Sequence, residues 1–292
     1  MLELQPAEDI RANTTVRIDA YGFERRGDFD SYKEMMNQYV DVLNRRSMRW
    51  SKLLQEKPHV EKNFTDMHRT FPDNILFKSK AEPGMQKALF NVLLAYGHHN
   101  PTVGYCQGMN FIAGYLMIIT KDEEKSFWLM DALVGRILPD YYTPAMLGLK
   151  TDQEVLGELV QVKAPAVGQL MAQYPGIWTL VVSRWFICLY IDVLPIETVL
   201  RVWDCLFYEG SKVLFRVALT LILHHQAEIL RARSLPDVCE CFKQITSGAF
   251  TLDCHTFMQK IFTEPKSLSM STVDKLREKC RQQILREESG HP

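Results

Sequence analysis

The sequence lacks a strong excess of charge of either sign. Its 34 lysine and arginine residues are balanced by 35 aspartate and glutamate residues, which gives a net charge of -1. Because proteins that bind nucleic acid usually have a basic excess, this balance argues against nucleic acid as a partner. With 47% hydrophobic and 24% charged residues, the chain has the composition of an ordinary globular protein.

The cysteines and histidines lack the spacings that predict disulfides or metal sites. The seven cysteines include no CxxC pair, so we expect reduced, mostly buried thiols, as in a cytosolic protein. Two pairs of adjacent histidines, His98–His99 and His224–His225, would point to different sides of a helix. We therefore expect no metal site in this chain.

The chain also lacks a secretory signal and a convincing membrane span. Its first residues, "MLELQPAEDIRANT", include acidic side chains and no apolar segment. The longest apolar stretch, "GIWTLVVSRWFICLYIDVLP", is interrupted by Arg184 and Asp192. A buried helix is therefore a better interpretation of this stretch than a transmembrane segment.

Helical periodicity dominates the chain, and no recurring alternation of apolar and polar residues predicts strands. We predict an all-α fold, with an N-terminal extension at 1–59 that contains one long helix and a helical domain at 60–288. The expected helices are 30–55, 60–68, 84–98, 109–119, 122–135, 151–174, 177–192, 196–207, 211–231, 235–246, 254–262 and 272–286. The expected caps are capping boxes opening at Thr120 and Thr151, and N-caps at Ser211, Ser234 and Ser271.

The first stretch with candidate chemistry is "TDMHRTFPDN", at 65–74. Asp66 and Arg69 are three residues apart, so on a helix they are neighbours and can form an ion pair. Such a pair adds only about 0.3 kcal/mol on an exposed helix, so its use would be to hold the guanidinium in one direction. An ordinary surface ion pair is the alternative.

The second stretch is "VGYCQGMNF", at 103–111, where Gln107 lies between Gly104 and Gly108. The glycines give the backbone freedom and allow it to approach another group closely. A glutamine amide donates and accepts hydrogen bonds without titrating, so it can orient a water molecule. The alternative is a buried glutamine that satisfies backbone groups at the start of a helix.

The third stretch is "LPIETVLRVWDCLFYEGS", at 194–211, where Trp203 lies between Arg201 and Asp204. A packing helix with one ion pair is the alternative here. The sequence contains no GxSxG, GxxxxGK[ST], GxGxxG or HExxH motif. Cys106 as a nucleophile is a further alternative, but no activating base is adjacent to it.

In this order, the three stretches resemble the TBC-domain family of Rab GTPase-activating proteins. Asp66 to Arg69 matches the D-x-x-R half of the family's IxxDxxR motif, and Tyr105 to Gly108 matches its YxQG motif in full. "LPIETVLRVWDCLF" is similar to the family's later Leu-Pro…Arg-x-Trp-Asp segment. The resemblance covers roughly Val60 to Arg281, together with "DAYGFERRGDFD" near the N-terminus.

The resemblance implies an activator that has no independent reaction and accelerates GTP hydrolysis by its partner. Arg69 would be an arginine finger, which is worth roughly 10³ to 10⁵ in rate. Gln107 would be a glutamine finger that positions the attacking water, and Asp66 would orient Arg69. The remaining supporting residues would be Gly104, Tyr105 and Gly108, which shape the glutamine loop, and Arg201, Trp203 and Asp204, which brace the domain behind it.

The partner implied by the resemblance is a Rab-family small GTPase in its GTP form, in vesicle trafficking and intracellular protein transport. GTP and magnesium would be held by that partner, and this chain would need no cofactor of its own. We expect a cytoplasmic protein that reaches endomembranes indirectly through its Rab.

Two departures from the family pattern affect this interpretation. Asn63 stands where the motif has an apolar residue, and no Gly-Ile/Val-Pro segment precedes Arg46 to Trp50, which fits the family's Arg-x-x-x-Trp helix. We therefore expect a form shortened before the arginine motif, missing the first helices of the domain, with apolar surface exposed on those that remain. A TBC-like module that binds a Rab or serves as a scaffold, without accelerating hydrolysis, is the alternative.

Overall fold

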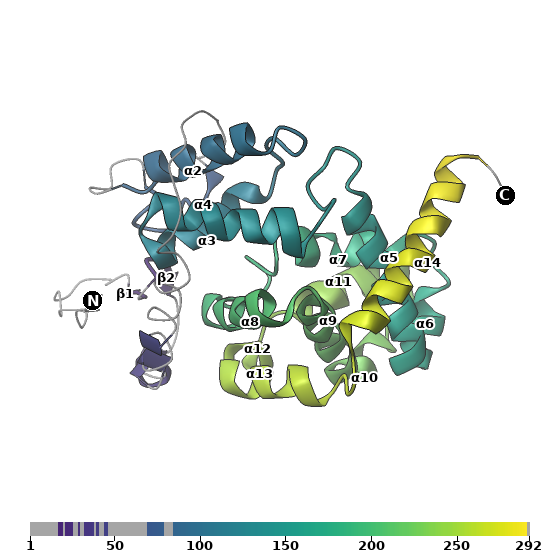
Figure 1. The fold of residues 1–292 in the computed structure, drawn as a ribbon. Coiled ribbons are helices and arrows are strands. Elements are labelled where there is room, and N and C mark those ends of the chain that lie inside the picture. The colour runs from purple at the N-terminus through teal and green to yellow at the C-terminus, as the bar shows by residue number, and fades with distance from the viewer. Residues whose placement is uncertain are drawn as a thin grey trace. The chain divides into compact units, whose positions relative to one another are not determined.

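A computed structural model describes residues 17–19, 21–25, 29, 32–37, 39–40, 44–45, 69–78 and 84–290 of the chain. The described part is predominantly helical, which confirms the all-α prediction (Figure 1). Within the predicted helix 30–55, the described residues 32–37, 39–40 and 44–45 are helical. The predicted helix 60–68 and the expected domain boundary at 59/60 lie outside the described residues.

The elements are numbered as in Figure 1. They are β1 (Arg17–Ile18), β2 (Glu24–Arg25), α2 (Gln86–His99), α3 (Met109–Thr120), α4 (Glu123–Asp131), the π-helix η2 (Ala132–Ile137), α5 (Leu147–Lys163), α6 (Pro165–Met171), α7 (Ile177–Ile187), α8 (Ile196–Glu209), α9 (Lys212–His224), α10 (Gln226–Ile229), α11 (Leu235–Gln244), α12 (Ala249–Leu252), α13 (Cys254–Thr263) and α14 (Met270–Glu288). The chain divides into two compact units: the first comprises 1–101 and 113–129, and the second 102–112 and 130–292. Of the three boundaries between the units, one falls within α3 and one within α4.

In the first unit, the short antiparallel pair β1–β2 is joined to the segment 71–77 through Asn74. The fully buried amide of Asn74 donates to Tyr21 O at 2.7 Å, and Ile75 N donates to Gly22 O at 2.9 Å. A Cβ at Gly22 would lie 2.5 Å from Asn74 Oδ1, and the φ of Gly22 is 92°. Glycine is required here both for its torsion and for this close approach.

Helix α2 confirms the helix predicted at 84–98, with Leu89, Val92, Leu93 and Tyr96 buried on one face. The capping box predicted at Thr120 is wrong by two residues. Asp122 Oδ1 accepts from Lys125 N at 2.9 Å, while the Thr120 hydroxyl hydrogen-bonds to Ser126 Oγ at 2.7 Å. An aspartate at the cap position is as effective as the expected threonine.

In the second unit, α5 packs against α6, α7 and α14, and α8 packs against α9 and α13. Apolar residues of α8 recur with helical spacing, so that Val199, Leu200, Trp203 and Leu206 are all buried. The largest fully buried rings of this unit are those of Trp203, Tyr141, Tyr142, Tyr190, Phe186, Phe215, Phe242 and Phe257.

The helix predicted at 151–174 is wrong in both bounds. Helix α5 begins at Leu147 and ends at Lys163, and α6 starts at Pro165, whose missing N–H prevents α5 from continuing. Thr151 is therefore inside α5 and caps nothing. Asp152, only 1% exposed, instead accepts two hydrogen bonds of 2.7 Å from Arg277 of α14.

Of the three serines predicted as N-caps, Ser234 is confirmed, since its hydroxyl accepts from Asp237 N at 3.3 Å. Ser211 precedes α9 but its hydroxyl accepts from Arg277 at 2.9 Å and makes no cap bond. Ser271 lies inside α14, which is capped by Ser269 through Thr272 N at 3.1 Å. The miss at Ser271 arises because the sequence offers another serine two positions earlier, and the miss at Ser211 arises because Arg277 occupies its hydroxyl.

Candidate functional site

Arg69 lies in a tight turn of the first unit, with its side chain exposed. The next two residues are buried, Thr70 at 1% and Phe71 at 4% exposure. Phe71 has a φ of 49°, in the left-handed region that is unfavourable for a bulky side chain. Such a conformation persists only where the surroundings hold it, so the turn after Arg69 is fixed by its neighbours.

The ring of Phe71 is the anchor of this turn. Its centroid lies 5.5 Å from that of Phe23, 5.6 Å from Phe77 and 5.1 Å from Tyr115. Gly114 of α3 leaves room for it, because a Cβ there would lie 2.7 Å from Phe71 Cε2. The exposed Arg69 thus lies two residues before a packed aromatic cluster. We call this cluster, formed by Phe23, Phe71, Phe77 and Tyr115, the Phe71 cluster.

The glutamine loop, residues 103–108, belongs to the second unit and presents Gln107 to solvent. Its two glycines have positive φ, 59° at Gly104 and 108° at Gly108. A Cβ at Gly104 would meet nothing within 4 Å, and one at Gly108 would come no closer than 3.6 Å to another atom. Within this chain neither glycine makes a close approach, so it is their positive torsions that favour glycine at these two positions.

Hydrogen bonds within the chain fix the end of the loop and the start of α3. Met109 N donates to Cys106 O at 3.1 Å, and Gly108 N donates to Asn110 Oδ1 at 3.2 Å. Asn110 is 3% exposed, so it satisfies the backbone from inside the unit. The alternative of a buried Gln107 serving this purpose is wrong, because the side chain of Gln107 is exposed.

Beside this loop lies a tight corner at 187–194, the α7 corner, where the helix predicted to reach Asp192 has already ended. Leu189, Tyr190 and Asp192 all have left-handed φ values, of 49°, 66° and 56°. The Tyr190 hydroxyl donates to Leu214 O at 2.8 Å from a fully buried position. Three strained non-glycine residues in four positions are maintained only by well-packed surroundings.

The α7 corner connects the glutamine loop to α8. A Cβ at Gly108 would be 3.6 Å from Ile187 Cγ1, so Gly108 lies beside the corner. Trp203 Nε1 donates to Leu189 O at 3.0 Å, and the Tyr142 hydroxyl donates to Ile187 O at 2.8 Å. The buried rings of Trp203 and Tyr142 thus hold the backbone of the α7 corner beside Gly108. Tyr142 was missed by sequence reasoning, because its aromatic loop resembled no motif.

The other residues singled out in α8 are half-buried. The guanidinium of Arg201 lies 3.2 Å from Nδ1 of His255, in α13. Because arginine only donates, Nδ1 is the acceptor, which assigns the ring proton of a neutral His255 to Nε2. Arg201 therefore ties α8 to α13, and Asp204 lies on the same helix one turn later.

The cysteine alternative has little support from the environment of its thiol. Burial raises the pKa of Cys106, and burial also raises the pKa of Cys188 to about 11. Catalytic cysteines need the opposite shift, because the thiolate is the nucleophile. Among the described residues, no group of three or more histidine, cysteine, aspartate and glutamate side chains is arranged to hold a metal ion.

The structure thus brings together the glutamine loop, the α7 corner and Trp203 in the second unit. Arg69 belongs to the first unit and is described there by itself. Asp66 and Asn63, and Arg46 to Trp50, lie outside the described residues. No helix in the described part of the chain combines the length and apolar character that crossing a membrane requires.

The sequence model of the Rab-GTPase-TBC domain matches residues 30–230, more than half of the chain. The chain belongs to the Rab-GTPase-TBC family. It is 58% identical over 345 aligned positions to growth hormone-regulated TBC protein 1-A of Danio rerio, with 98% of this chain and 97% of that protein covered. It is 64% identical over 282 positions to growth hormone-regulated TBC protein 1 of Rattus norvegicus, covering 95% of this chain and 98% of that protein.

Solved structures of the TBC family share the fold. The crystal structure of the Chlamydomonas flagellar RabGAP TBC domain superposes with a TM-score of 0.58 at 31% sequence identity. That similarity covers 77% of this chain and 72% of the Chlamydomonas chain. Family and fold together support a role as an activator of a Rab GTPase.

Proposed function

We propose that this TBC chain accelerates GTP hydrolysis by a Rab-family GTPase and supplies two side chains in trans, Arg69 and Gln107. The observation that carries the proposal is that both motif residues are exposed, Arg69 directly before packed residues and Gln107 on a loop whose end is held by hydrogen bonds. Catalysis of phosphoryl transfer depends on positioning and on charge stabilisation, so an exposed side chain on a fixed turn is what the reaction requires.

Arg69 acts on the charge that develops on the phosphates in the transition state. A guanidinium remains protonated at any physiological pH and donates in a fixed planar geometry to phosphate oxygens. Packing of the Phe71 cluster supports the proposal, because it limits the motion of the turn from which Arg69 extends. Asp66 orients the guanidinium by pairing with it, a role inferred from their spacing alone.

Gln107 orients the attacking water through its amide, which is the task of a glutamine in the GTPase itself. Gly104, Tyr105 and Gly108 shape the loop that presents it. Trp203 supports the loop from behind through Leu189 O and the α7 corner. Arg201 and Asp204, which also lie on α8, support the domain behind the loop together with Trp203.

The nucleotide and its magnesium ion belong to the partner in this proposal. This chain contributes no reaction of its own and binds the Rab in its GTP form. Membrane recruitment then follows from the Rab, which places the activator at endomembranes and leaves it cytoplasmic otherwise.

The proposal is tested by single-turnover hydrolysis on a panel of GTP-loaded Rabs. We expect at least one Rab to respond, and Arg69→Ala to remove roughly 10³-fold or more of the acceleration. Gln107→Ala should also abolish most of it. Exposed residues of the same types, changed in Arg231→Ala and Gln259→Ala, serve as controls and should leave the rate unchanged. Full activity in both motif variants would refute the dual-finger assignment.

A Rab-binding module without catalytic activity is the second candidate. It is favoured by the alignment to the Danio rerio relative, which spans 345 positions although this chain has 292 residues, so that relative contains residues absent from this chain. The Rattus norvegicus relative aligns over 282 positions without such an excess. The same panel separates the candidates, since a module of this kind binds a GTP-loaded Rab and leaves its hydrolysis rate unchanged.

A further inference from the structure

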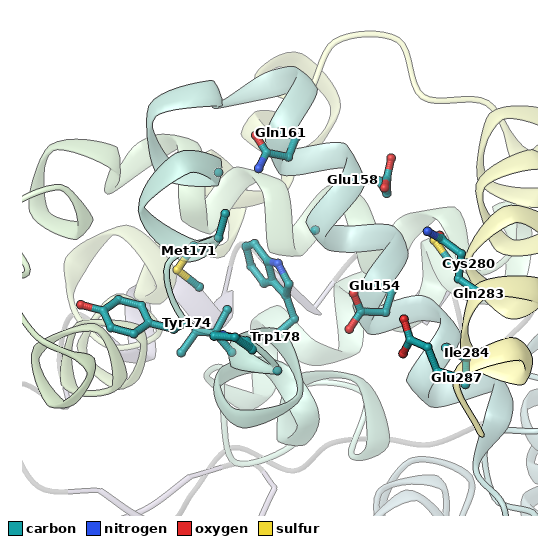
Figure 2. Close-up of a pocket in the computed structure, with 16 residues that line it drawn as sticks. Glu154, Glu158, Gln161, Met171, Tyr174, Trp178, Cys280, Gln283, Ile284 and Glu287 are labelled. Atoms are coloured by element: carbon teal, nitrogen blue, oxygen red, sulfur yellow. The ribbon is translucent and has the colours of Figure 1, made fainter. Parts of the chain in front are cut away.

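A pocket of about 470 Å³ opens on the second unit, between α5, the α6–α7 connection and α14. Figure 2 shows Glu154, Glu158 and Gln161 of α5 on one side and Cys280, Gln283, Ile284 and Glu287 of α14 on the other. Its volume is within the range of sites that hold small ligands or single side chains. None of the residues in the glutamine loop or the α7 corner lines it.

Apolar groups form much of the pocket wall. Trp178 and Met171 are buried, and Ile284 completes the apolar surface from α14. The Trp178 ring packs closely against α5 because Gly157 makes room for it: a Cβ there would be 2.6 Å from Trp178 Nε1. A wall of this kind suits an apolar chain or a flat group that can lie against an indole ring.

The polar part of the pocket carries charge of one sign. Glu154, Glu158 and Glu287 line it, and no lysine, arginine or histidine does. Lys279, outside the lining, pairs with Glu158 at 2.7 Å. Within the described part of the chain, no ion pair is formed by Glu154 or Glu287, although they face each other in Figure 2.

The two unpaired carboxylates interact unfavourably. Both residues are exposed, but partial burial of Glu154 in the pocket wall, followed by repulsion from Glu287 and Glu158, raises its pKa above the ordinary value. A cation between Glu154 and Glu287 would remove this repulsion and gain two charge-assisted hydrogen bonds. The pocket is therefore complementary to a positive group on an apolar stem.

We propose that this pocket binds the side chain of an arginine in a peptide segment of a partner protein. A guanidinium is planar and presents its donors in a fork, so it can bridge Glu154 and Glu287 while its methylene stem lies against Trp178. Stacking of a guanidinium on an indole adds a favourable cation–π interaction. The compact ammonium group of lysine makes this interaction less fully, so arginine is preferred. The site is independent of the two motif residues, so it provides a second contact surface of the chain.

The test uses the full chain labelled with 5-fluorotryptophan, whose five tryptophans give separate fluorine resonances. The resonance of Trp178 is assigned from its absence in Trp178→Phe. The probe is the blocked tripeptide acetyl-Gly-Arg-Gly-amide. The control peptide has citrulline in place of arginine, which keeps nearly the same shape and removes the charge. We expect a saturable shift of the Trp178 resonance with the arginine peptide and at least about tenfold weaker binding of the citrulline peptide.

Substitutions at the two carboxylates test whether the arginine peptide binds in this pocket. The double variant Glu154→Gln/Glu287→Gln should weaken binding of the arginine peptide about tenfold or more. Glu240→Gln changes a carboxylate on α11 that is 59% exposed and paired with Lys243, and it should leave binding unchanged. Equal binding of the citrulline peptide, unchanged affinity in the double variant, or no saturable shift of Trp178 would each overturn the proposal. If the double variant failed to fold, the comparison of the two peptides on the wild-type chain would still decide.

Discussion

The turn of Arg69 and the loop of Gln107 are both exposed but are fixed by different means. The arginine turn depends on side-chain packing, with the Phe71 ring between three other aromatic rings. The glutamine loop depends on backbone torsions, with two glycines at positive φ and a strained corner behind it. The arginine turn should therefore be sensitive to loss of buried side-chain volume. The glutamine loop should be sensitive to any substitution that changes its backbone torsions.

This difference explains why the two motifs differ in sequence specificity. Packing like that of Phe71 can be achieved by many combinations of apolar residues, so the support of the arginine turn leaves no fixed sequence pattern. A positive φ of 108° is available to glycine and to few other residues, so the glutamine motif requires Gly108 itself. The loop is the more diagnostic of the two motifs for this physical reason.

The largest effect is expected from Phe71→Ala. Removing a buried phenylalanine from the Phe71 cluster should cost about 3–5 kcal/mol of stability, measured by urea unfolding. Phe262→Ala is the matched control, since Phe262 is 39% exposed and should cost much less. Similar losses in both variants would show that the Phe71 cluster does not anchor the arginine turn.

An intermediate effect is expected from Gly108→Ala. Forcing alanine to a φ of 108° costs on the order of 1–3 kcal/mol, so the loop will shift and the rate of GTP hydrolysis by the Rab, as stimulated by this chain, should fall about tenfold to hundredfold. Gly104→Ala is the milder comparison, because a φ of 59° with open space around it is accessible at lower cost. If Gly104→Ala were the more damaging change, torsion at Gly108 would not control the loop.

The smallest effect is expected from Tyr142→Phe, which removes the hydrogen bond to Ile187 O and keeps the ring. The net loss should be about 1 kcal/mol, and the maximal hydrolysis rate should fall about fivefold with the affinity for the Rab unchanged. Tyr208→Phe removes a hydroxyl that is 90% exposed and should change neither quantity. A fall in affinity without a fall in maximal rate would place Tyr142 outside the support of the loop.

Regular helices were predictable where a single apolar face repeats, as in α2 and α8. The helix ends were less predictable, because Thr120 and Ser271 satisfy the local rule for a cap while Asp122 and Ser269 are used instead. The α7 corner was not predictable, since its left-handed Leu189 and Tyr190 contradict local preference and are held by tertiary contacts. The same is true of Asp152, whose buried bond to Arg277 joins residues 125 positions apart.

The exposure of the two motif residues agrees with the prediction from sequence, whereas the residues that support them were not predictable. Gln107 between two glycines suggested a presented side chain, and its exposure agrees with that expectation. The contacts of Gly108 with Ile187 and of Tyr142 with the same residue come from distant parts of the chain that share no pattern. Local sequence therefore identified which side chains are presented, and only the fold identified what holds them.

The central claim is that this chain supplies the glutamine that positions the attacking water. It is tested most directly by single-turnover hydrolysis on a responsive Rab whose own catalytic glutamine is replaced by alanine. If Gln107 performs this task, the wild-type chain will still accelerate hydrolysis by the altered Rab, and Gln107→Ala will not. Loss of acceleration by the wild-type chain on that altered Rab, with acceleration of the unaltered Rab intact, would contradict the account.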